Sequence, residues 1–200
     1  MATEVEICNK ALRSIGEDRI TALSDATEPG RLCTDLYPFA RDAVLREHPW
    51  RCAVTRAQLS QMTATPAFGF DYQYQIPTDC LRVLGVYDSS GAEITDSASW
   101  AKEAYNDGDK TRQVIVTDET ALYAKYIRRE TDPAQFDPLL IEALSARLAA
   151  ELAERLPKAN TVTDMAWKLY VNKLAAAKFV DATEAAQPEA WTSTWESSKF

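Results

Sequence analysis

The segment between Phe136 and Pro157 limits the possible folds of this chain more than any other stretch. Asp137 is a preferred N-cap residue and Pro138 suits the first position of a helix, so a helix is predicted to begin there. Apolar residues then recur at helical spacing, namely Ile141, Leu144, Leu148 and Leu152. Because a helix with such a stripe must bury it, the chain needs other elements that present matching apolar faces.

The N-terminal residues predict another helix of this kind. Thr3 followed by Glu6 is the pattern of a capping box, which satisfies backbone donors at the start of a helix. Gly16 is expected to end the helix, since glycine readily adopts the left-handed conformation found after many helices. The predicted apolar stripe between these two signals consists of Ile7, Cys8, Ala11, Leu12 and Ile15.

Two more helices are expected. One runs from near Pro29 to Glu47, with a kink or a broken turn at Pro38 because proline removes a backbone hydrogen bond. The other begins at Thr161 or Thr163 and ends near Ala182. The predicted buried side of the first consists of Leu32, Leu36, Phe39, Ala40, Ala43 and Val44, and that of the second of Met165, Leu169, Leu174 and Phe179.

Between the two pairs of helices the apolar pattern changes from helical spacing to alternation. Alternating residues such as Tyr72 and Tyr74 are typical of strands, and Asn106-Asp107-Gly108 is typical of a hairpin or loop. The predicted strands are residues 52–60, 70–76, 81–88, 113–117 and 121–129. The middle of the chain is therefore predicted to form a small antiparallel sheet.

The predicted fold is mainly α within the α+β class. It is a four-helix bundle with an inserted small antiparallel β-sheet and an extended C-terminal tail, because the four amphipathic helices have only each other to bury against. The expected organisation is residues 1–50 for the first two helices, 51–130 for the inserted β region, 131–182 for the last two helices and 183–200 for a flexible C-terminal segment.

Composition narrows the classes of partner. No apolar run approaches the ~18 residues that cross a bilayer, and the first residues lack the basic and apolar regions of a secretory signal, so neither membrane insertion nor export is expected. The formal net charge is −8, from 30 acidic and 22 basic residues, which disfavours tight binding to nucleic acid. DNA could still slide through an acidic channel, since the channel would repel its phosphates.

Catalytic and metal-binding patterns are weak. His48 is the single histidine and is interpreted as a turn residue, and the sequence contains no glycine-rich phosphate loop. Carboxylates such as Glu142, Glu151 and Asp71 are interpreted as surface charges, although a carboxylate pair remains possible by residue type. The cysteines Cys8, Cys33, Cys52 and Cys80 match no metal or redox spacing and are interpreted as small buried hydrophobes rather than a disulfide pair. No catalytic, cofactor-binding or metal-binding residue is predicted.

Two groups of residues are candidates for contacts with other proteins. Arg128 and Arg129 end the last predicted strand and could touch phosphate or an acidic neighbouring subunit, although such residues often only solubilise a surface. Trp191, Trp195 and Phe200 lie in a C-terminal segment without aliphatic periodicity, which is either a disordered tail or a segment that orders when it docks.

Four stretches together resemble a known family. They are Ile7-Cys8-Asn9-Lys10-Ala11-Leu12 with Ile15-Gly16; Ala40-Arg41-Asp42-Ala43-Val44-Leu45 with His48-Pro49-Trp50; Tyr72-Gln73-Tyr74-Gln75-Ile76-Pro77 with Asp79-Cys80-Leu81-Arg82-Val83-Leu84; and Phe136-Asp137-Pro138 with Ala143-Leu144 and Leu148-Ala149-Ala150-Glu151-Leu152-Ala153. In this order and spacing the chain resembles the tail tubular protein A group of short-tailed phages and related head-to-tail connector adaptors.

The resemblance implies a structural role in a virion at the head-tail junction, with assembly in the host cytoplasm. It implies a ring of copies of this chain, about twelve to match the portal, through which DNA passes without specific binding. The implied partners are the portal protein, for which Trp191, Trp195 and Phe200 are the docking candidates, and a tail or nozzle protein.

Two other functions remain open on the sequence. One is a virion-associated cell-wall hydrolase that uses a carboxylate pair. The other is a generic helical adaptor that binds a protein partner unrelated to phage.

Overall fold

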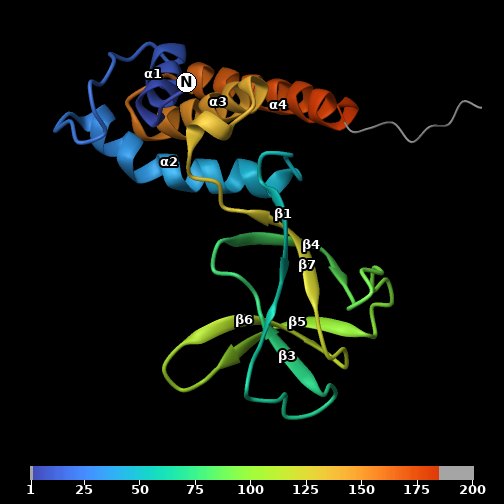
Figure 1. Ribbon diagram of the computed structural model, residues 1–200. Helices are drawn as coiled ribbons and strands as arrows, with labels where there is room; N and C mark the ends of the chain where they lie inside the picture. The colour runs from blue at the N-terminus through green and yellow to red at the C-terminus, as the bar shows by residue number, and fades with distance from the viewer. Residues whose placement is uncertain (1, 185–200) are drawn as a thin grey trace, which may run out of the picture. The chain divides into compact units, whose positions relative to one another are not determined.

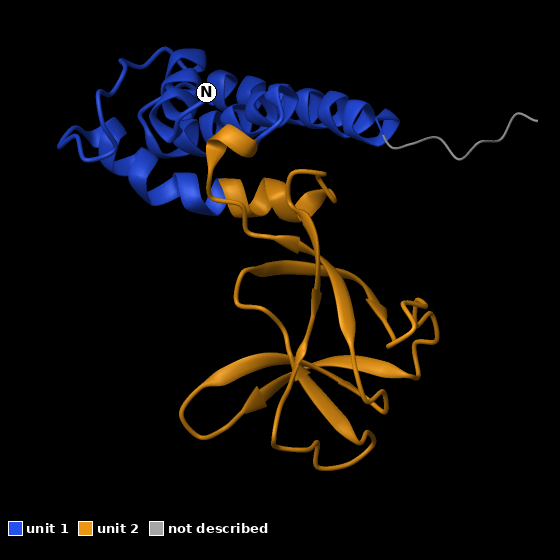
Figure 2. Ribbon diagram, viewed as in Figure 1, with its two compact units in different colours: residues 1–40, 136–200 blue, residues 41–135 orange. Residues whose placement is uncertain are grey.

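The computed structural model describes residues 2–184, which form two compact units. The helical unit comprises residues 1–40 and 136–200, and the β unit comprises residues 41–135 (Figure 2). The chain thus begins in the helical unit, forms the β unit, and returns.

The predicted four-helix bundle with a small inserted sheet is wrong. The described residues contain four α-helices and seven strands in two antiparallel sheets, with 42% helix and 22% strand, which is a mixed α+β fold. The prediction failed because the β region does not depend on the helices for a core. It has an apolar interior of its own.

The helical unit is organised around α3 (Pro138–Arg155), which packs against α1 (Glu4–Ser14) and α4 (Asn160–Thr183) (Figure 1). Alanines on α3 let neighbouring backbones approach closely. Because residues on most sides of α3 are buried, this helix belongs to the core rather than to its surface. Its buried residues are Leu140, Ala143, Leu144, Ser145, Ala146, Leu148, Ala149, Ala150, Leu152 and Ala153.

The predicted helix boundaries at α1 and α3 are confirmed. Thr3 and Glu6 form the capping box, in which each side chain accepts a hydrogen bond from the other residue's backbone N–H. At the other end of α1, Gly16 has φ +73°, and the N–H of Glu17 donates to the carbonyl of Leu12 at 3.0 Å, which closes the helix. Asp137 caps α3 by accepting from the N–H of Leu139 at 2.7 Å.

α4 buries a different face from the predicted one. Of the predicted residues only Leu174 is buried, whereas Met165 is 70% exposed, Leu169 41% and Phe179 70%. The buried face contains Ala166, Tyr170, Leu174 and Ala177. α4 carries two apolar stripes, and contact with α3 selects the one with small residues and Tyr170.

Polar contacts of Arg147 reinforce this choice. The Arg147 guanidinium of α3 lies 4.9 Å from the ring centre of Trp167 and 5.4 Å from that of Tyr170, both on α4. A cation over aromatic faces contributes about 0.5–2 kcal/mol, depending on exposure. The indole N–H of Trp167 donates to Glu154 at 2.8 Å. These contacts hold the Tyr170 side of α4 against α3.

α2 (Glu28–Glu47) also differs from its prediction. It continues through Pro38, so the turn there is not broken. Phe39, predicted to be buried, is 74% exposed, while Cys33, Tyr37, Ala40 and Val44 are buried. The spacing of these four residues defines a face rotated away from Phe39.

The β unit contains seven strands in two antiparallel sheets. β1 (Val54–Gln58), β7 (Tyr123–Arg128) and β4 (Cys80–Tyr87) form the first, in that order. β2 (Ser60–Gln61), β3 (Tyr72–Gln75), β6 (Thr111–Thr117) and β5 (Trp100–Asn106) form the second. A short 3-10 helix, η1 (Pro133–Gln135), follows.

Two strands were not predicted as such. The predicted strand 52–60 is divided at Leu59, whose N–H donates to the carbonyl of Leu122 at 2.9 Å, so the chain passes from the first sheet to the second. β5 lacks aliphatic alternation and lies at the edge of its sheet, where it pairs with β6. A central strand requires apolar faces, whereas an edge strand needs only one backbone partner, so β5 has little sequence signal.

Both sheets contribute to the core of the β unit. Tyr74 and Ile115 come from the second sheet, and Val86 and Tyr126 come from the first. The complete buried cluster is Leu59, Tyr74, Ile76, Val86, Ile115, Leu122, Ala124 and Tyr126. A core shared by two sheets explains why this region forms a compact unit of its own.

All four cysteines are free thiols, and the interpretation as small buried hydrophobes is confirmed for Cys8 and Cys33. Cys8 and Cys33 are both 0% exposed in the helical unit, and Cys52 and Cys80 are half-buried. The contact with Cys33 and burial raise the pKa of the Cys8 thiol, so Cys8 stays protonated and packs as a small apolar side chain.

A pair of leucine substitutions tests the central role of α3. Leu148→Ala is expected to lower the free energy of unfolding by about 2–5 kcal/mol, because Leu148 is 0% exposed and its truncation leaves a cavity. Leu169→Ala makes the same chemical change on α4 at a 41% exposed position and is expected to cost less than about 1 kcal/mol. Urea denaturation of both variants measures the difference, and equal losses would contradict the assignment.

Candidate functional site

The predicted contact residues Arg128 and Arg129 lie where the central strand of the first sheet ends. The backbone N–H of Arg128 donates to the carbonyl of Ala53, and that of Arg129 donates to Asp79, both at 2.7 Å. The neighbouring chain segments on both sides therefore fix this part of the backbone. The side chains of Arg128 and Arg129 therefore extend from a backbone that is held by hydrogen bonds.

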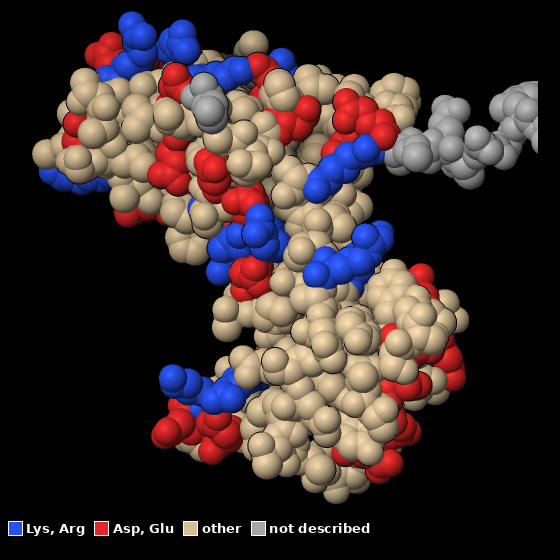
Figure 3. All heavy atoms as spheres, viewed as in Figure 1, with Lys and Arg blue, Asp and Glu red and all other residues tan. Residues whose placement is uncertain are grey.

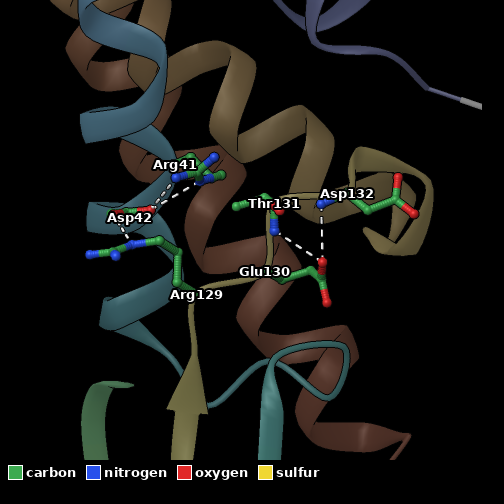
Figure 4. A network of polar contacts seen from close by, with 6 residues as sticks. All are labelled: Arg41, Asp42, Arg129, Glu130, Thr131 and Asp132. Carbon is green, nitrogen blue, oxygen red and sulfur yellow. Dashed lines mark hydrogen bonds and ion pairs between the residues drawn. The ribbon is translucent and has the colours of Figure 1, made fainter. Parts of the chain in front are cut away.

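Asp42 holds two guanidinium groups at once (Figure 4). Its Oδ1 accepts from Arg41 Nε at 3.0 Å and from Arg41 Nη2 at 2.8 Å, while its Oδ2 accepts from Arg129 Nε at 2.7 Å. One carboxylate thus sets the direction of two arginines. The Arg41 side chain is 9% exposed, whereas that of Arg129 is 43% exposed and presents its remaining N–H groups to solvent.

Glu130 has the equivalent role for Arg128. Its carboxylate pairs with Arg128 and accepts from the backbone N–H groups of Thr131 at 2.9 Å and Asp132 at 3.0 Å (Figure 4). Glu130 is only 7% exposed, so these bonds compensate for its burial. The Arg128 side chain remains 46% exposed. Both arginines are held by carboxylates of their own chain, and their contact with another subunit stays a prediction.

A second candidate surface is the outer face of α4, which we define as Val162, Met165, Leu169, Asn172, Ala176 and Phe179. The intervals between these residues alternate between three and four, the spacing of a helix face that packs on another helix. Met165 and Phe179 are each 70% exposed within the single chain. Large apolar side chains arranged in a row usually mark a binding surface rather than random exposure.

Four of the six residues of this outer face line a groove, the α4 groove. The groove has a volume of about 500 Å³, and α1 contributes Ser14 and Ile15 to its wall. Its lining is mainly apolar, with Lys168 at its edge. The complete lining is Ser14, Ile15, Val162, Met165, Ala166, Lys168, Leu169 and Asn172.

Beside the groove, Glu142 of α3 joins two lysines. It pairs with Lys10 of α1 and, at 2.8 Å, with Lys173 of α4. Both lysines lower the pKa of the Glu142 carboxyl by stabilising its charged form, Lys10 more strongly. This carboxylate therefore links the three packed helices of the helical unit.

A third surface is the outer edge of α2, which we define as Leu32, Leu36, Phe39 and Ala43. Phe39 is 74% exposed and the other three are half-buried. These residues are separated by four, three and four positions, so they form one stripe along the helix. Asp35, one turn before Phe39, is exposed beside them.

The exposed positions of Met165, Leu169, Phe179 and Phe39 were not predicted, because these residues were expected to lie in the core. The spacing of Met165, Leu169 and Phe179 is visible in the sequence, but so is that of Tyr170 and Leu174. Two apolar stripes on one helix are a signal for one internal and one external partner. The remaining predicted residues, Trp191, Trp195 and Phe200, lie outside the described residues.

The single histidine lies in an aromatic contact. His48 lies at the end of α2 with its ring 4.7 Å from that of Trp50, edge to face. Among residues 2–184 there is no group of three or more His, Cys, Asp or Glu side chains suited to a metal ion. Within the same part of the chain, no helix is both long and apolar enough to span a membrane.

On the face shown in Figure 3, basic side chains occur in small groups that alternate with acidic ones.

Comparison of the chain with models of known protein families finds no match, and comparison with curated proteins finds no significant match either. The candidate surfaces therefore have to be judged on their own chemistry.

The arginine network predicts a specific cost for the loss of Glu130. Glu130→Ala is expected to lower the free energy of unfolding by about 1–3 kcal/mol, because two backbone donors and Arg128 lose their acceptor. Glu103→Ala, at an exposed position on β5, is the matched control and is expected to change stability by no more than about 0.5 kcal/mol. Urea denaturation decides between the two outcomes.

The lowered pKa of Glu142 predicts a pH-dependent contribution. The stability difference between the unchanged protein and Glu142→Gln is expected to be full at pH 7 and to shrink as the pH falls below about 4.3, the pKa of an unfolded glutamate. The stabilisation is lost at low pH because, as the pH falls, the Glu142 carboxyl takes up a proton at a higher pH in the unfolded state than in the folded state. A Lys10→Met, Lys173→Met background should remove the effect, and a pH-independent difference in urea denaturation would contradict it.

Proposed function

We propose that this chain is a structural head-to-tail adaptor subunit of a tailed bacteriophage. In this role it forms a ring below the portal, connects the portal to the tail and lets DNA pass. It acts through surfaces that bind other proteins and not as an enzyme.

The main support is the exposure of large apolar side chains on the helical unit. Phe39 and Phe179 are 74% and 70% exposed, and each belongs to a row of apolar residues on its helix. An aromatic side chain buries ~150–250 Å² when it finds a partner, so leaving several in solvent is costly unless a partner covers them. This arrangement suits a subunit that is completed by assembly.

The resemblance to connector adaptors supports the phage assignment. Residues of its stretches form the cores of both units: Leu12 and Leu144 are buried in the helical unit, and Tyr74 in the β unit. Trp50 is 1% exposed and its indole N–H donates to the carbonyl of Val44 at 2.9 Å. The similar residues therefore belong to the scaffold, which fits a family with a common structure and no common reaction.

Charge supports the passage of DNA. The chain has a formal net charge of −8, and a ring of such subunits would carry a strongly acidic surface. An acidic lumen repels the phosphate backbone, so DNA would move through without a binding step.

Each part of the chain has a role in this proposal. The helical unit forms the ring wall, and the β unit meets the tail or nozzle protein. Residues 186–200 dock on the portal through Trp191, Trp195 and Phe200, which would become buried there. Arg128 and Arg129 meet an acidic neighbouring subunit.

Mixing the full chain with the portal protein of the same phage tests this function. Electron microscopy is expected to show a ring of adaptor density on the portal, and a chain that ends at residue 185 is expected to bind at least ~30-fold more weakly, as the loss of buried aromatic anchors requires. Val171→Ala, at a 60% exposed position outside the α4 groove, leaves residues 186–200 intact and is the control for portal docking.

Two results would count against the proposal. One is the absence of any association with the portal or with other virion proteins. The other is cell-wall degradation by the purified chain that is lost on a single Glu→Gln substitution, which would favour a hydrolase.

A further inference from the structure

The outer face of α4 and the outer edge of α2 are two distinct apolar surfaces, and all of their residues except Ala43 belong to the helical unit. In Figure 1 the first part of α2 runs along one side of this unit and α4 along the other. One surface is concave, since Met165 and Leu169 line the α4 groove, and the other projects Phe39 into solvent. Their shapes are therefore complementary.

The charges beside these surfaces are complementary as well. Lys168 and Lys173 flank the outer face of α4 on its two sides, and Lys168 lines the groove. Along α2, Glu28 and Asp35 lie seven residues apart beside the outer edge. Asp35 and Lys168 are exposed, and neither forms an ion pair within residues 2–184.

A contact between two copies of the α4 face is disfavoured. Such a symmetric contact would bring Lys168 and Lys173 of one copy close to the same lysines of the other. Like charges in a helix interface reduce affinity and act against that pairing. A helix that presents a projecting apolar side chain beside an exposed carboxylate is the better occupant, and α2 of another copy supplies Phe39 and Asp35.

We infer that the α4 groove binds the outer edge of α2 from a second copy of this chain. Phe39 enters the groove between Met165 and Leu169, and Asp35 lies opposite Lys168. The contact rests on the proposed function in one respect, namely that copies of the chain assemble side by side.

This contact joins two different surfaces, so a pair of copies retains one free groove on one copy and one free α2 edge on the other. Repetition of such a heterologous contact generates a closed ring or an open filament, whereas a symmetric contact stops at a dimer. The inference therefore identifies the surfaces through which a ring would grow, and it assigns that growth to the helical unit.

Two variants, each with one surface disabled, test the inference without the portal. Phe39→Asp disables the α2 edge, and Leu169→Asp disables the groove. Each alone is expected to weaken self-association at least ~30-fold, because a carboxylate would enter an apolar contact. Their equimolar mixture is expected to form one-to-one dimers and nothing larger, since one intact groove and one intact edge remain. Sedimentation velocity measures all three samples.

Matched substitutions control for effects on folding and on charge. Val171→Asp lies on α4 at a 60% exposed position about half a turn away from the outer face, and Phe68→Asp changes an 88% exposed phenylalanine of the β unit. Both are expected to associate like the unchanged chain. Asp35→Lys and Lys168→Glu are each expected to weaken association ~2- to 5-fold, and the double variant to restore it.

Several outcomes would overturn the inference. These are a monomeric unchanged chain up to about 1 mM, equal losses for Leu169→Asp and Val171→Asp, and a mixture of the two disabled variants that stays monomeric. Loss of association on removal of residues 185–200 would instead assign the groove to that segment. Self-association with no portal binding would reject the proposed function and keep this contact. Portal binding that neither Phe39→Asp nor Leu169→Asp affects would keep the proposed function and reject this contact.

Discussion

The burial of α3 on most of its sides is the constraint on which the helical unit depends. Leu144 and Leu148 lie at its centre, and alanines at other buried positions let α1 and α4 come close. Each neighbour of α3 therefore contributes only one face to the core. Whatever apolar surface a neighbouring helix carries elsewhere remains outside, which is how α4 buries Tyr170 and Leu174 yet exposes Met165 and Phe179.

Electrostatic contacts stabilise this choice of buried faces. Arg147 lies over two aromatic rings of α4, and Glu142 pairs with lysines from α1 and α4. In the β unit, Asp42 and Glu130 hold Arg129 and Arg128. The charged side chains described here therefore position helices and strands. The surfaces that remain available to other molecules are mainly apolar, together with the half-exposed Arg128 and Arg129.

Such a division between internal charge pairs and external apolar rows suits a protein whose function is assembly. An enzyme needs polar groups that converge on a cavity, whereas an assembly subunit needs separate surfaces with complementary shape and charge. The α4 groove and the outer edge of α2 expose apolar side chains, and Arg128 and Arg129 are half-exposed. The adaptor proposal accounts for all three, and its phage context comes from the resemblance of the scaffold residues.

The sequence alone determined the start of α1 and α3, the end of α1 and the presence of strands in the middle of the chain, because caps, glycine and alternation act locally. It also predicted Arg128 and Arg129 as contact candidates. It could not decide which stripe of α2 or α4 is buried, nor that β5 pairs at a sheet edge or that the chain changes sheets at Leu59. Those features depend on which distant residues meet, and only the tertiary structure fixes that, since several faces of similar hydrophobicity compete for one core.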